Sequence, residues 1–454
     1  MRSERVKEYK KAGFLLSFIL FTIHCSLFTE VYALDVKRTV LPNGLTLLQV
    51  ERHNLPTVMA TLLVKAGPSA EAPDKAGLAN LTAELLTEGT KTRKASDISD
   101  AIEFIGGSLR VSAESDYTTI SLSILKKDVE RGFEILSDTV LNPVFREEEI
   151  KRKKELIKGS LKQSEENPSF VASKAFKKAV FGDLSYGRLV EGSIETIDAL
   201  TREEIVRFHD RYYRPNNAVL SVVGDLTDAE LASLVKRFLS EWKAAEVPRF
   251  TPPPGPIPER KMILVDRDLT QASIIVGQAG ISRDNPDYYA FSVMNYILGG
   301  GGFSSRLMQT VRDELGLAYD IHSLLFPYKY AGLFEVGVQT KNRSANTVIS
   351  EIVKQIEKIS SVAVSDQELK DAQAYLTGSF PRRLDTNRKI ADFLVAVEFY
   401  GLGLDYIEKY PQYIHAVTKE DVLGAAKKYL DAERYVLVVV GKQSEAAVES
   451  KGER

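Results

Sequence analysis

The sequence is poor in the residues that bind metals or carry sulfur chemistry. Of its 454 residues one is a cysteine, Cys25, and five are histidines. Cys25 lies in an N-terminal apolar run, and removal of that run would leave no thiol for a disulfide, a nucleophile or a metal ligand. Four histidines lie further along, and no two of them are within five residues of each other: His53, His209, His322 and His415. We therefore expect no local histidine pair for zinc and expect surface or helix-capping positions for these four.

The sequence also lacks an excess of positively or negatively charged residues. The 60 Lys and Arg residues nearly balance the 62 Asp and Glu residues, which leaves a formal net charge of −2. This balance gives no reason to expect a nucleic acid as a partner. The 44% hydrophobic and 27% charged residues are typical of a globular protein. The length alone is consistent with about two to four domains.

The first 33 residues have the pattern of an export signal. A basic start is followed by an apolar run over residues 12–28 and by Val31-Tyr32-Ala33, a suitable cleavage site. This predicts a signal peptide over residues 1–33 and an exported protein, periplasmic or otherwise extracytoplasmic. The alternative is an uncleaved anchor, because the run is nearly long enough to span a bilayer. After cleavage no membrane segment would remain.

A proline-rich stretch divides the rest of the chain into two similar halves. Six prolines lie between residues 247 and 261, and such a run continues neither a helix nor a central strand. The halves look like copies, because residues 199–205 match residues 416–422 in chemistry at an offset of 217. We predict a domain over 34–244, a linker over 245–261, a second domain over 262–445 and a polar tail over 446–454.

Each half mixes strand patterns with helix patterns. The predicted strands and helices of the first half cover residues 46–50, 58–64, a hairpin over 109–125, helices over 147–163 and 201–213, and a strand over 218–223. Thr201 with Glu204 three residues later forms a capping-box pattern. Strands and helices come in clusters rather than in strict alternation. This order predicts an α+β fold with a mostly antiparallel sheet in each half.

Residues 77–90, Gly-Leu-Ala-Asn-Leu-Thr-Ala-Glu-Leu-Leu-Thr-Glu-Gly-Thr, predict a short amphipathic helix closed by Gly89. Asn80 and Glu84 are four residues apart and share one face. On an exposed helix face, Glu84 is expected to be solvated.

This frame resembles the metal-binding helix of the insulinase/pitrilysin metallopeptidases, whose motif His-x-x-Glu-His stands inside Gly-Leu-Ala…Gly-Thr. The resemblance spans residues 36–443 and implies paired sheet-and-helix domains that form half of a clam-shell chamber. It places the two histidine ligands at Asn80 and Glu84 and the general base at Ala83. A third, glutamate ligand would stand at Ser160. All four positions are replaced, so the resemblance implies no metal in this chain and no water activated on it.

The second half contains Gly299-Gly300-Gly301-Gly302 and, further on, Arg312 and Tyr319. Four successive glycines exceed what a helix cap needs, and no phosphate-binding motif accompanies them. Such a bare backbone lets another chain approach closely or lets the segment flex. On its own the pair would be a solvated arginine and a half-buried tyrosine, with Gly316 breaking the helix between them.

In the insulinase-like second domain, an Arg-x6-Tyr pair of this kind reaches across the closed chamber to the zinc site. A guanidinium and a phenol can bind a substrate carbonyl and stabilise an oxyanion. The resemblance thus gives Arg312 and Tyr319 this role in trans and gives Gly299 to Gly302 contact with substrate.

The chain is similar to the metal-free subunit of paired, two-domain members such as the mitochondrial processing peptidase. The resemblance therefore implies a heterodimer with a homologous zinc-bearing subunit, which would hold the zinc, and extended peptides as substrates. Two alternatives stay open. One is a scaffold or peptide-binding protein with no catalytic role, and the other is an independent peptidase with an unusual metal site.

Overall fold

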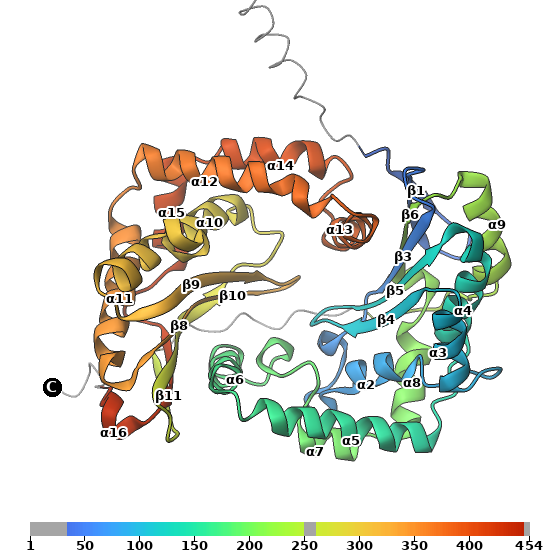
Figure 1. Cartoon of the computed structure of the whole chain (residues 1–454), viewed down its shortest axis with the longest axis horizontal. Coiled ribbons are helices and arrows are strands. Elements are labelled where there is room, and N and C mark those ends of the chain that lie inside the picture. Colours follow the sequence, from blue (N-terminus) through green and yellow to red (C-terminus); the bar gives the residue numbers. More distant parts are fainter. Residues whose placement is uncertain (1–33, 249–259, 449–454) are drawn as a thin grey trace, which may run out of the picture.

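The computed structural model describes residues 34–248 and 260–448. The predicted signal peptide lies outside these residues, as do most of the predicted linker and the last six residues of the tail, so the predicted domain boundaries stay predictions. Among the described residues, no helix combines the length and the apolar character that crossing a membrane requires. Figure 1 shows two halves, each a sheet with helices: the N-terminal half in blue to green and the C-terminal half in yellow to red.

The N-terminal half is built on a six-stranded sheet. Its strands are β1 (Lys37–Val40), β2 (Thr46–Glu51), β3 (Thr57–Val64), β4 (Ser108–Ala113), β5 (Thr118–Leu125) and β6 (Ala218–Gly224). Its helices are α2 (Leu78–Leu85), α3 (Ala95–Phe104), α4 (Val129–Leu141), α5 (Glu147–Ser164), α6 (Pro168–Phe181), α7 (Ile194–Ala199), α8 (Arg202–Tyr212) and α9 (Asp228–Leu239).

The C-terminal half is built on a five-stranded sheet. Its strands are β7 (Lys261–Asp266), β8 (Gln271–Gly280), β9 (Ala318–Pro327), β10 (Gly332–Lys341) and β11 (Val436–Gly441). Its α-helices are α10 (Tyr288–Asn295), α11 (Ala345–Ser361), α12 (Asp366–Ser379), α13 (Asn387–Tyr400), α14 (Tyr406–His415), α15 (Lys419–Tyr429) and α16 (Gln443–Ala446).

The two sheets repeat one topology. The order β2-β6-β3-β5-β4 in the first sheet corresponds to β7-β11-β8-β10-β9 in the second, and β1 adds an edge strand to the first. In each sheet one strand pair is parallel, with Thr46 opposite Val219 and Lys261 opposite Val436, and the other pairs are antiparallel. The prediction of a duplicated α+β fold with mostly antiparallel sheets is confirmed.

The helix that precedes the last strand of each sheet begins in the same way. Thr201 caps α8, and its hydroxyl accepts from the backbone N–H of Glu204, while the Glu204 carboxylate accepts from the N–H of Thr201. Thr418 and Asp421 form the same reciprocal box at the start of α15. The predicted capping box at Thr201 is confirmed, because local residue types alone determine this motif.

The halves exchange one helix each. Helix α6 follows α5 in the first half, yet it packs on β8 and β11 of the second sheet, whereas α13 of the second half packs on β3 and β6 of the first (Figure 1). The α6 contact is apolar, and it buries Phe176 and Ala172 against residues such as Ile275 and Val438. Because Gly277 has no side chain, the Phe176 ring fits against the backbone of β8. Each sheet is therefore covered on one face by a helix of the other half.

Polar groups fix α13 on the first sheet. The Arg38 guanidinium donates two hydrogen bonds to the Glu398 carboxylate, at 3.0 and 2.8 Å. The Thr61 hydroxyl on β3 donates to Asp392 at 2.8 Å. These bonds set the register of a helix whose apolar residues, including Leu394, lie in one core with Leu48 and Val219.

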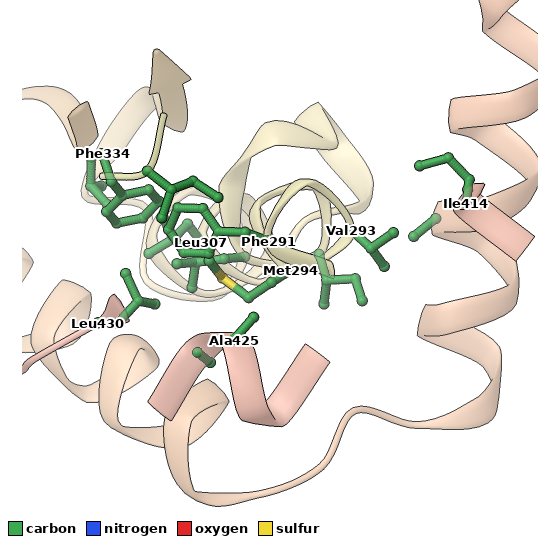
Figure 2. Close-up of a cluster of buried hydrophobic side chains, with 14 of the residues drawn as sticks. Phe291, Val293, Met294, Leu307, Phe334, Ile414, Ala425 and Leu430 are labelled. Atoms are coloured by element: carbon green, nitrogen blue, oxygen red, sulfur yellow. The ribbon is translucent and has the colours of Figure 1, made fainter. Parts of the chain in front are cut away.

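That shared core continues into the helices of the C-terminal half. Figure 2 shows its centre, where Phe291 and Met294 of α10 lie between Phe334 of β10 and Ala425 of α15. The N-terminal half has a separate core between its sheet and helices α2 to α5 and α7 to α9. Helix α13 thus joins one face of the first sheet to the core of the C-terminal half, and α6 forms a further cluster on the second sheet.

A buried polar contact joins the tips of two hairpins, one from each half. The Asp116 carboxylate, after β4, accepts from the Tyr186 hydroxyl at 2.7 Å and from the backbone N–H of Lys329, after β9, at 3.0 Å. The Lys329 ammonium in turn donates to the backbone carbonyl of Phe399 on α13 at 2.9 Å. Burial raises the pKa of Asp116, and the Tyr186 hydrogen bond opposes that shift.

The helix exchange predicts a large effect of truncating Phe176. Phe176→Ala removes a fully buried ring between α6 and β8 and should lower the free energy of unfolding by about 3–5 kcal/mol, measured by urea denaturation of the mature chain. The matched control is Phe104→Ala on α3, where the residue is 92% exposed and the change should stay within about 0.5 kcal/mol. Equal effects of the two variants would contradict the stabilising role of the exchange.

Candidate functional site

Helix α2, which carries the metallopeptidase-like frame, is held at its start by a buried carboxylate. Glu71 accepts from the backbone N–H groups of Gly77 at 3.0 Å and Ala79 at 2.9 Å, the unpaired donors of a first helical turn. Gly77 has a φ of +93°, and a side chain there would meet the carbonyl oxygen of Glu191 at 2.5 Å. Glu71 was not predicted from the sequence because it stands seven residues before the first residue of the helix.

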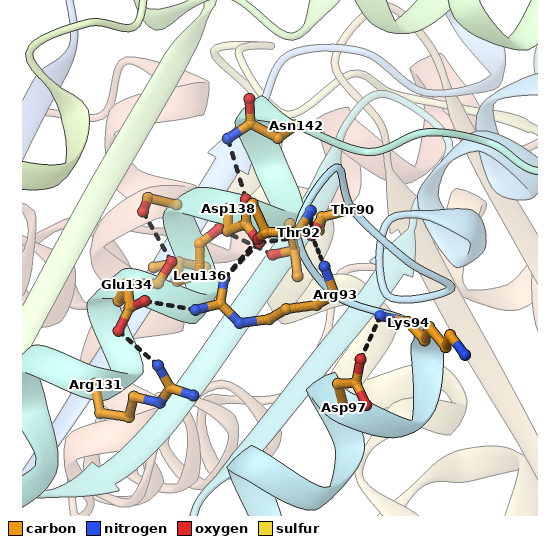
Figure 3. Close-up of polar contacts among 12 residues, drawn as sticks. Thr90, Thr92, Arg93, Lys94, Asp97, Arg131, Glu134, Leu136, Asp138 and Asn142 are labelled. Atoms are coloured by element: carbon orange, nitrogen blue, oxygen red, sulfur yellow. Dashed lines mark hydrogen bonds and ion pairs between the residues drawn. The ribbon is translucent and has the colours of Figure 1, made fainter.

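The far end of the frame is fixed as well, although α2 ends at Leu85, four residues before the predicted stop at Gly89. Asp138 of α4 accepts from the Thr90 hydroxyl at 2.6 Å, from Thr92 at 3.0 Å and from the Arg93 guanidinium (Figure 3). Burial opposes ionisation of Asp138, but these hydrogen bonds keep its pKa below the ordinary value. The Gly-Thr end of the motif is therefore a rigid attachment to α4.

Asn80 and Glu84 lie on neighbouring turns of α2, and Ser160 lies on α5. The Asn80 amide donates to the Glu84 carboxylate at 3.2 Å, which confirms the predicted shared face. Ala83 is fully buried, and its methyl side chain cannot take a proton from water as the family's glutamate would.

Glu84 is paired rather than merely solvated. The Lys153 ammonium of α5 lies 3.4 Å from the Glu84 carboxylate and 2.9 Å from that of Glu88. The Lys153 side chain is only 17% exposed, so its positive charge is held close to the two carboxylates. The expectation of a free surface carboxylate was wrong because α5, distant in sequence, packs against α2.

The residues present do not fit a zinc ion. Zinc requires three or four ligands of nitrogen, sulfur or carboxylate type, and Glu84 is the one such group among the four motif positions. Its carboxylate already faces a fixed ammonium, and Ser160 is exposed on α5. Within residues 34–248 and 260–448, no group of three or more His, Cys, Asp or Glu residues is arranged to hold a metal ion.

The four histidines do not share one setting. His209 is 8% exposed on α8, and its ring Nε2 lies 2.8 Å from the carbonyl oxygen of Val140. The surface or capping role expected for His209 was therefore wrong, because its ring also stacks on Tyr213 in the core. Burial lowers the pKa of His209, so its ring is neutral. His53 and His322 each pair with an aspartate at the surface.

The glycine run of the second half begins in a π-helical turn, η6 (Tyr296–Gly300), directly after α10, and ends in a 3₁₀ turn over Gly302–Ser304. Gly299 is buried, and a side chain there would meet the Ser323 backbone nitrogen at 2.6 Å, so this glycine serves internal packing. Gly300 and Gly302 are exposed and leave bare backbone at the surface. π-helical turns are rare and are frequent at functional sites.

Arg312 and Tyr319 come together at the end of a second π-helical turn, η8 (Met308–Glu314). The predicted break at Gly316 is present, with a φ of +62°, and Tyr319 follows on β9. The Arg312 guanidinium carbon lies 5.5 Å from the centre of the Tyr319 ring and 4.7 Å from that of Phe303. Phe303 was missed in the sequence, where a large apolar residue directly after four glycines was the available signal.

The surroundings of the arginine leave its hydrogen-bond donors unused. Tyr319 is 87% and Phe303 70% exposed. Asp313 is the one acidic residue near Arg312, with 3.6 Å between its carboxylate and the guanidinium, and no hydrogen bond from the guanidinium to another described residue is present. By contrast Arg306, a few residues earlier, donates two hydrogen bonds to the Glu368 carboxylate, at 2.7 and 3.1 Å.

The fold and the site together define an α+β chain of two halves, of the metallopeptidase kind, with a metal-binding helix that has lost its ligands and an arginine–tyrosine pair in the other half. A family model described as Insulinase (Peptidase family M16) matches residues 47–193, and one described as Peptidase M16 inactive domain matches residues 199–376. The chain belongs to this family, the insulinase or M16 peptidases.

Relatives and solved structures of similar size support this assignment. The chain is 28% identical over 414 residues to an uncharacterized zinc protease of Mycobacterium leprae (strain TN), covering 89% of this chain and 92% of the relative. A Pseudomonas fluorescens structure described as a peptidase M16 inactive domain has a TM-score of 0.81 at 28% identity, covering 90% of this chain and 98% of that one. A Helicobacter pylori protease shares the fold, with a TM-score of 0.83 at 21% identity, covering 90% of this chain and 100% of that one.

The buried carboxylate at the start of α2 predicts a pH dependence of stability. Burial raises the pKa of Glu71 from 4.5 to about 7, against the opposing hydrogen bonds from Ala79 and Gly77. The folded protein therefore binds a proton more tightly than the unfolded chain, so this group stabilises the fold below about pH 4.5 and loses that effect as the pH rises through about 7.

Urea unfolding of the mature chain at about pH 5 and about pH 8 tests this. Glu71→Gln should remove a pH-dependent difference of up to about 3 kcal/mol. The control is Glu148→Gln on an exposed face of α5, which should leave the profile unchanged. Parallel profiles for wild type and Glu71→Gln would show that Glu71 keeps its ordinary pKa.

The ligand set predicts that the purified mature chain, equilibrated with zinc and then dialysed, holds only substoichiometric zinc by atomic emission. A comparison variant restores the family ligands with Asn80→His, Ala83→Glu, Glu84→His and Ser160→Glu. Lys153 places a positive charge beside one of these positions, Glu84, so adding Lys153→Met should increase zinc retention further. One tightly held zinc per wild-type chain would contradict the assignment.

Proposed function

We propose that this chain is the zinc-free subunit of an exported insulinase-like metalloendopeptidase. Its task is to supply Arg312 and Tyr319 to the active site of a homologous, zinc-bearing partner subunit. Three features support the proposal: the family membership, the lack of a zinc ligand set on α2, and the intact arginine–tyrosine pair on the other half.

The main observation behind the proposal is the set of contacts that the Arg312 guanidinium makes. Its guanidinium is held against two aromatic rings, and no hydrogen bond to a described residue uses its donors. Cation–π contact fixes a guanidinium without occupying its N–H groups. Oriented donors of this kind can bind the carbonyl of a peptide and stabilise the charge that develops on its oxygen.

The rest of the reaction belongs to the partner in this proposal. The partner's zinc site would supply the activated water, and this chain would contribute binding and charge stabilisation. Substrates would be extended peptides, whose backbone can pair with a sheet edge. Export follows from the predicted signal peptide over residues 1–33, which also directs the search for the partner to exported homologues with an intact His-x-x-Glu-His motif.

Two substitutions of the donor pair test the proposal in a mixture with that partner. Arg312→Ala should lower hydrolysis of an extended fluorogenic peptide by about 10²–10³-fold, the usual effect of losing one oxyanion donor, without changing the zinc content of the mixture. Tyr319→Phe keeps the ring beside Arg312 and removes only the phenolic donor, so it should lower the rate without altering subunit association.

The matched control is Arg343→Ala, an exposed arginine between β10 and α11 of the same half. It should leave the activity of the mixture unchanged. If Arg312→Ala leaves the activity intact as well, the pair is not part of the site. A stable homodimer that never recruits a zinc-bearing homologue would favour the scaffold function instead.

A further inference from the structure

A pocket lies beside Tyr319, on the face of the C-terminal sheet that α6 partly covers. Strands β8, β9 and β10 form the floor of a pocket of about 680 Å³, and α6 forms a wall with Ser169 and Ser173. Tyr319 is also part of the lining. The helix exchange therefore creates this pocket, since its wall belongs to the first half and its floor to the second.

The pocket contains a buried carboxylate, one oxygen of which has no hydrogen-bond partner among the described residues. Glu335 on β10 is 8% exposed, and its Oε2 atom has neither accessible surface nor a hydrogen-bond partner. Lys177 of α6 and His322 of β9 act on Glu335 electrostatically, but neither forms an ion pair with it. Burial raises the pKa of Glu335 above its ordinary value. A buried charge in this state is costly unless something pairs with it.

The strand register makes room next to this carboxylate. Alternate residues of β10 point to the same face, so Glu335, Gly337 and Gln339 all line the pocket. Gly337 leaves a space between its two polar neighbours that the His322 ring borders, since a Cβ atom there would lie 3.3 Å from Nε2 of that ring. The Gln339 amide donates to the Ser169 hydroxyl at 2.9 Å, which holds the far wall in place.

We propose that this pocket binds a cationic group of a peptide, a lysine or arginine side chain, through the Glu335 carboxylate. The inference rests on the proposed function, because it places a specificity pocket of the bound peptide next to Tyr319. An ammonium or guanidinium supplies both the missing charge and the missing hydrogen-bond donors. The other charged groups in the lining are Asp320, already beside His322, and Lys341.

Peptide binding to the mature chain alone tests the pocket without any catalysis. The probes are N-acetylated, C-amidated octapeptides of alanine and leucine that carry either one central lysine or the uncharged isostere norleucine, compared by competition with a fluorescent peptide. Wild type should prefer the lysine peptide by about ten- to hundredfold, the range of one charge-assisted hydrogen bond. A norleucine peptide with a free N-terminus distinguishes a terminal ammonium from a side chain as the bound cation.

Three variants identify the cause of the preference. Glu335→Gln should reduce it to within about twofold while leaving the thermal unfolding temperature unchanged or higher, because a desolvated charge is removed. Gly337→Val keeps the carboxylate but fills the space, and it should also abolish the preference. Glu420→Gln, at an exposed glutamate of α15 in the same half, is the matched control and should keep it.

The outcomes separate this proposal from the proposed function. A lysine preference that survives Glu335→Gln, the absence of a preference in wild type, or no peptide binding at all would each overturn the pocket, whatever the activity of the mixture. A lost preference in Glu335→Gln together with full activity of Arg312→Ala in the mixture would support the pocket and overturn the catalytic role.

Discussion

The exchange of helices α6 and α13 is the constraint on which the rest of the structure depends. Each sheet would expose an apolar face if it folded with its own half alone, and the face of the second sheet is closed by Phe176 of the first half. Glu398 and Asp392 of α13 tie the reciprocal contact to β1 and β3. Because both faces are closed at once, the halves have a fixed relation, and the polar contact at Asp116 joins parts already brought together.

Much of this fold was accessible from the sequence because its signals are local. The capping box at Thr201, the hairpin over residues 109–125 and the repeated pattern of residues 199–205 and 416–422 depend on neighbouring residues, and the structure contains all of them. The sheet that α6 covers could not be predicted, since an amphipathic pattern does not specify which sheet a helix packs against. The pairing of Glu84 with Lys153 could not be predicted for the same reason.

The α2 frame is intact without the metal ligands, because the residues that hold the helix in place differ from the residues at the ligand positions. The helix is held by Glu71 at its start and, through Thr90, by Asp138 beyond its end, and seven of its eight residues are buried. None of these contacts uses a side chain of the ligand set. A chain can therefore keep the helix while losing its chemistry, whereas the Arg312 pair, held only by two exposed rings, has little structural reason to persist.

The helix exchange also governs the order in which the protein can be made. Helix α6 is complete when Phe181 has been added, but β11, which it covers, ends at Gly441, more than two hundred residues later. Until then the apolar side of α6 has no sheet to cover, and contacts of such long range form slowly and leave a chain prone to aggregation. The contact between α6 and β11 can therefore form only after Gly441 has been added, long after α6 itself is complete.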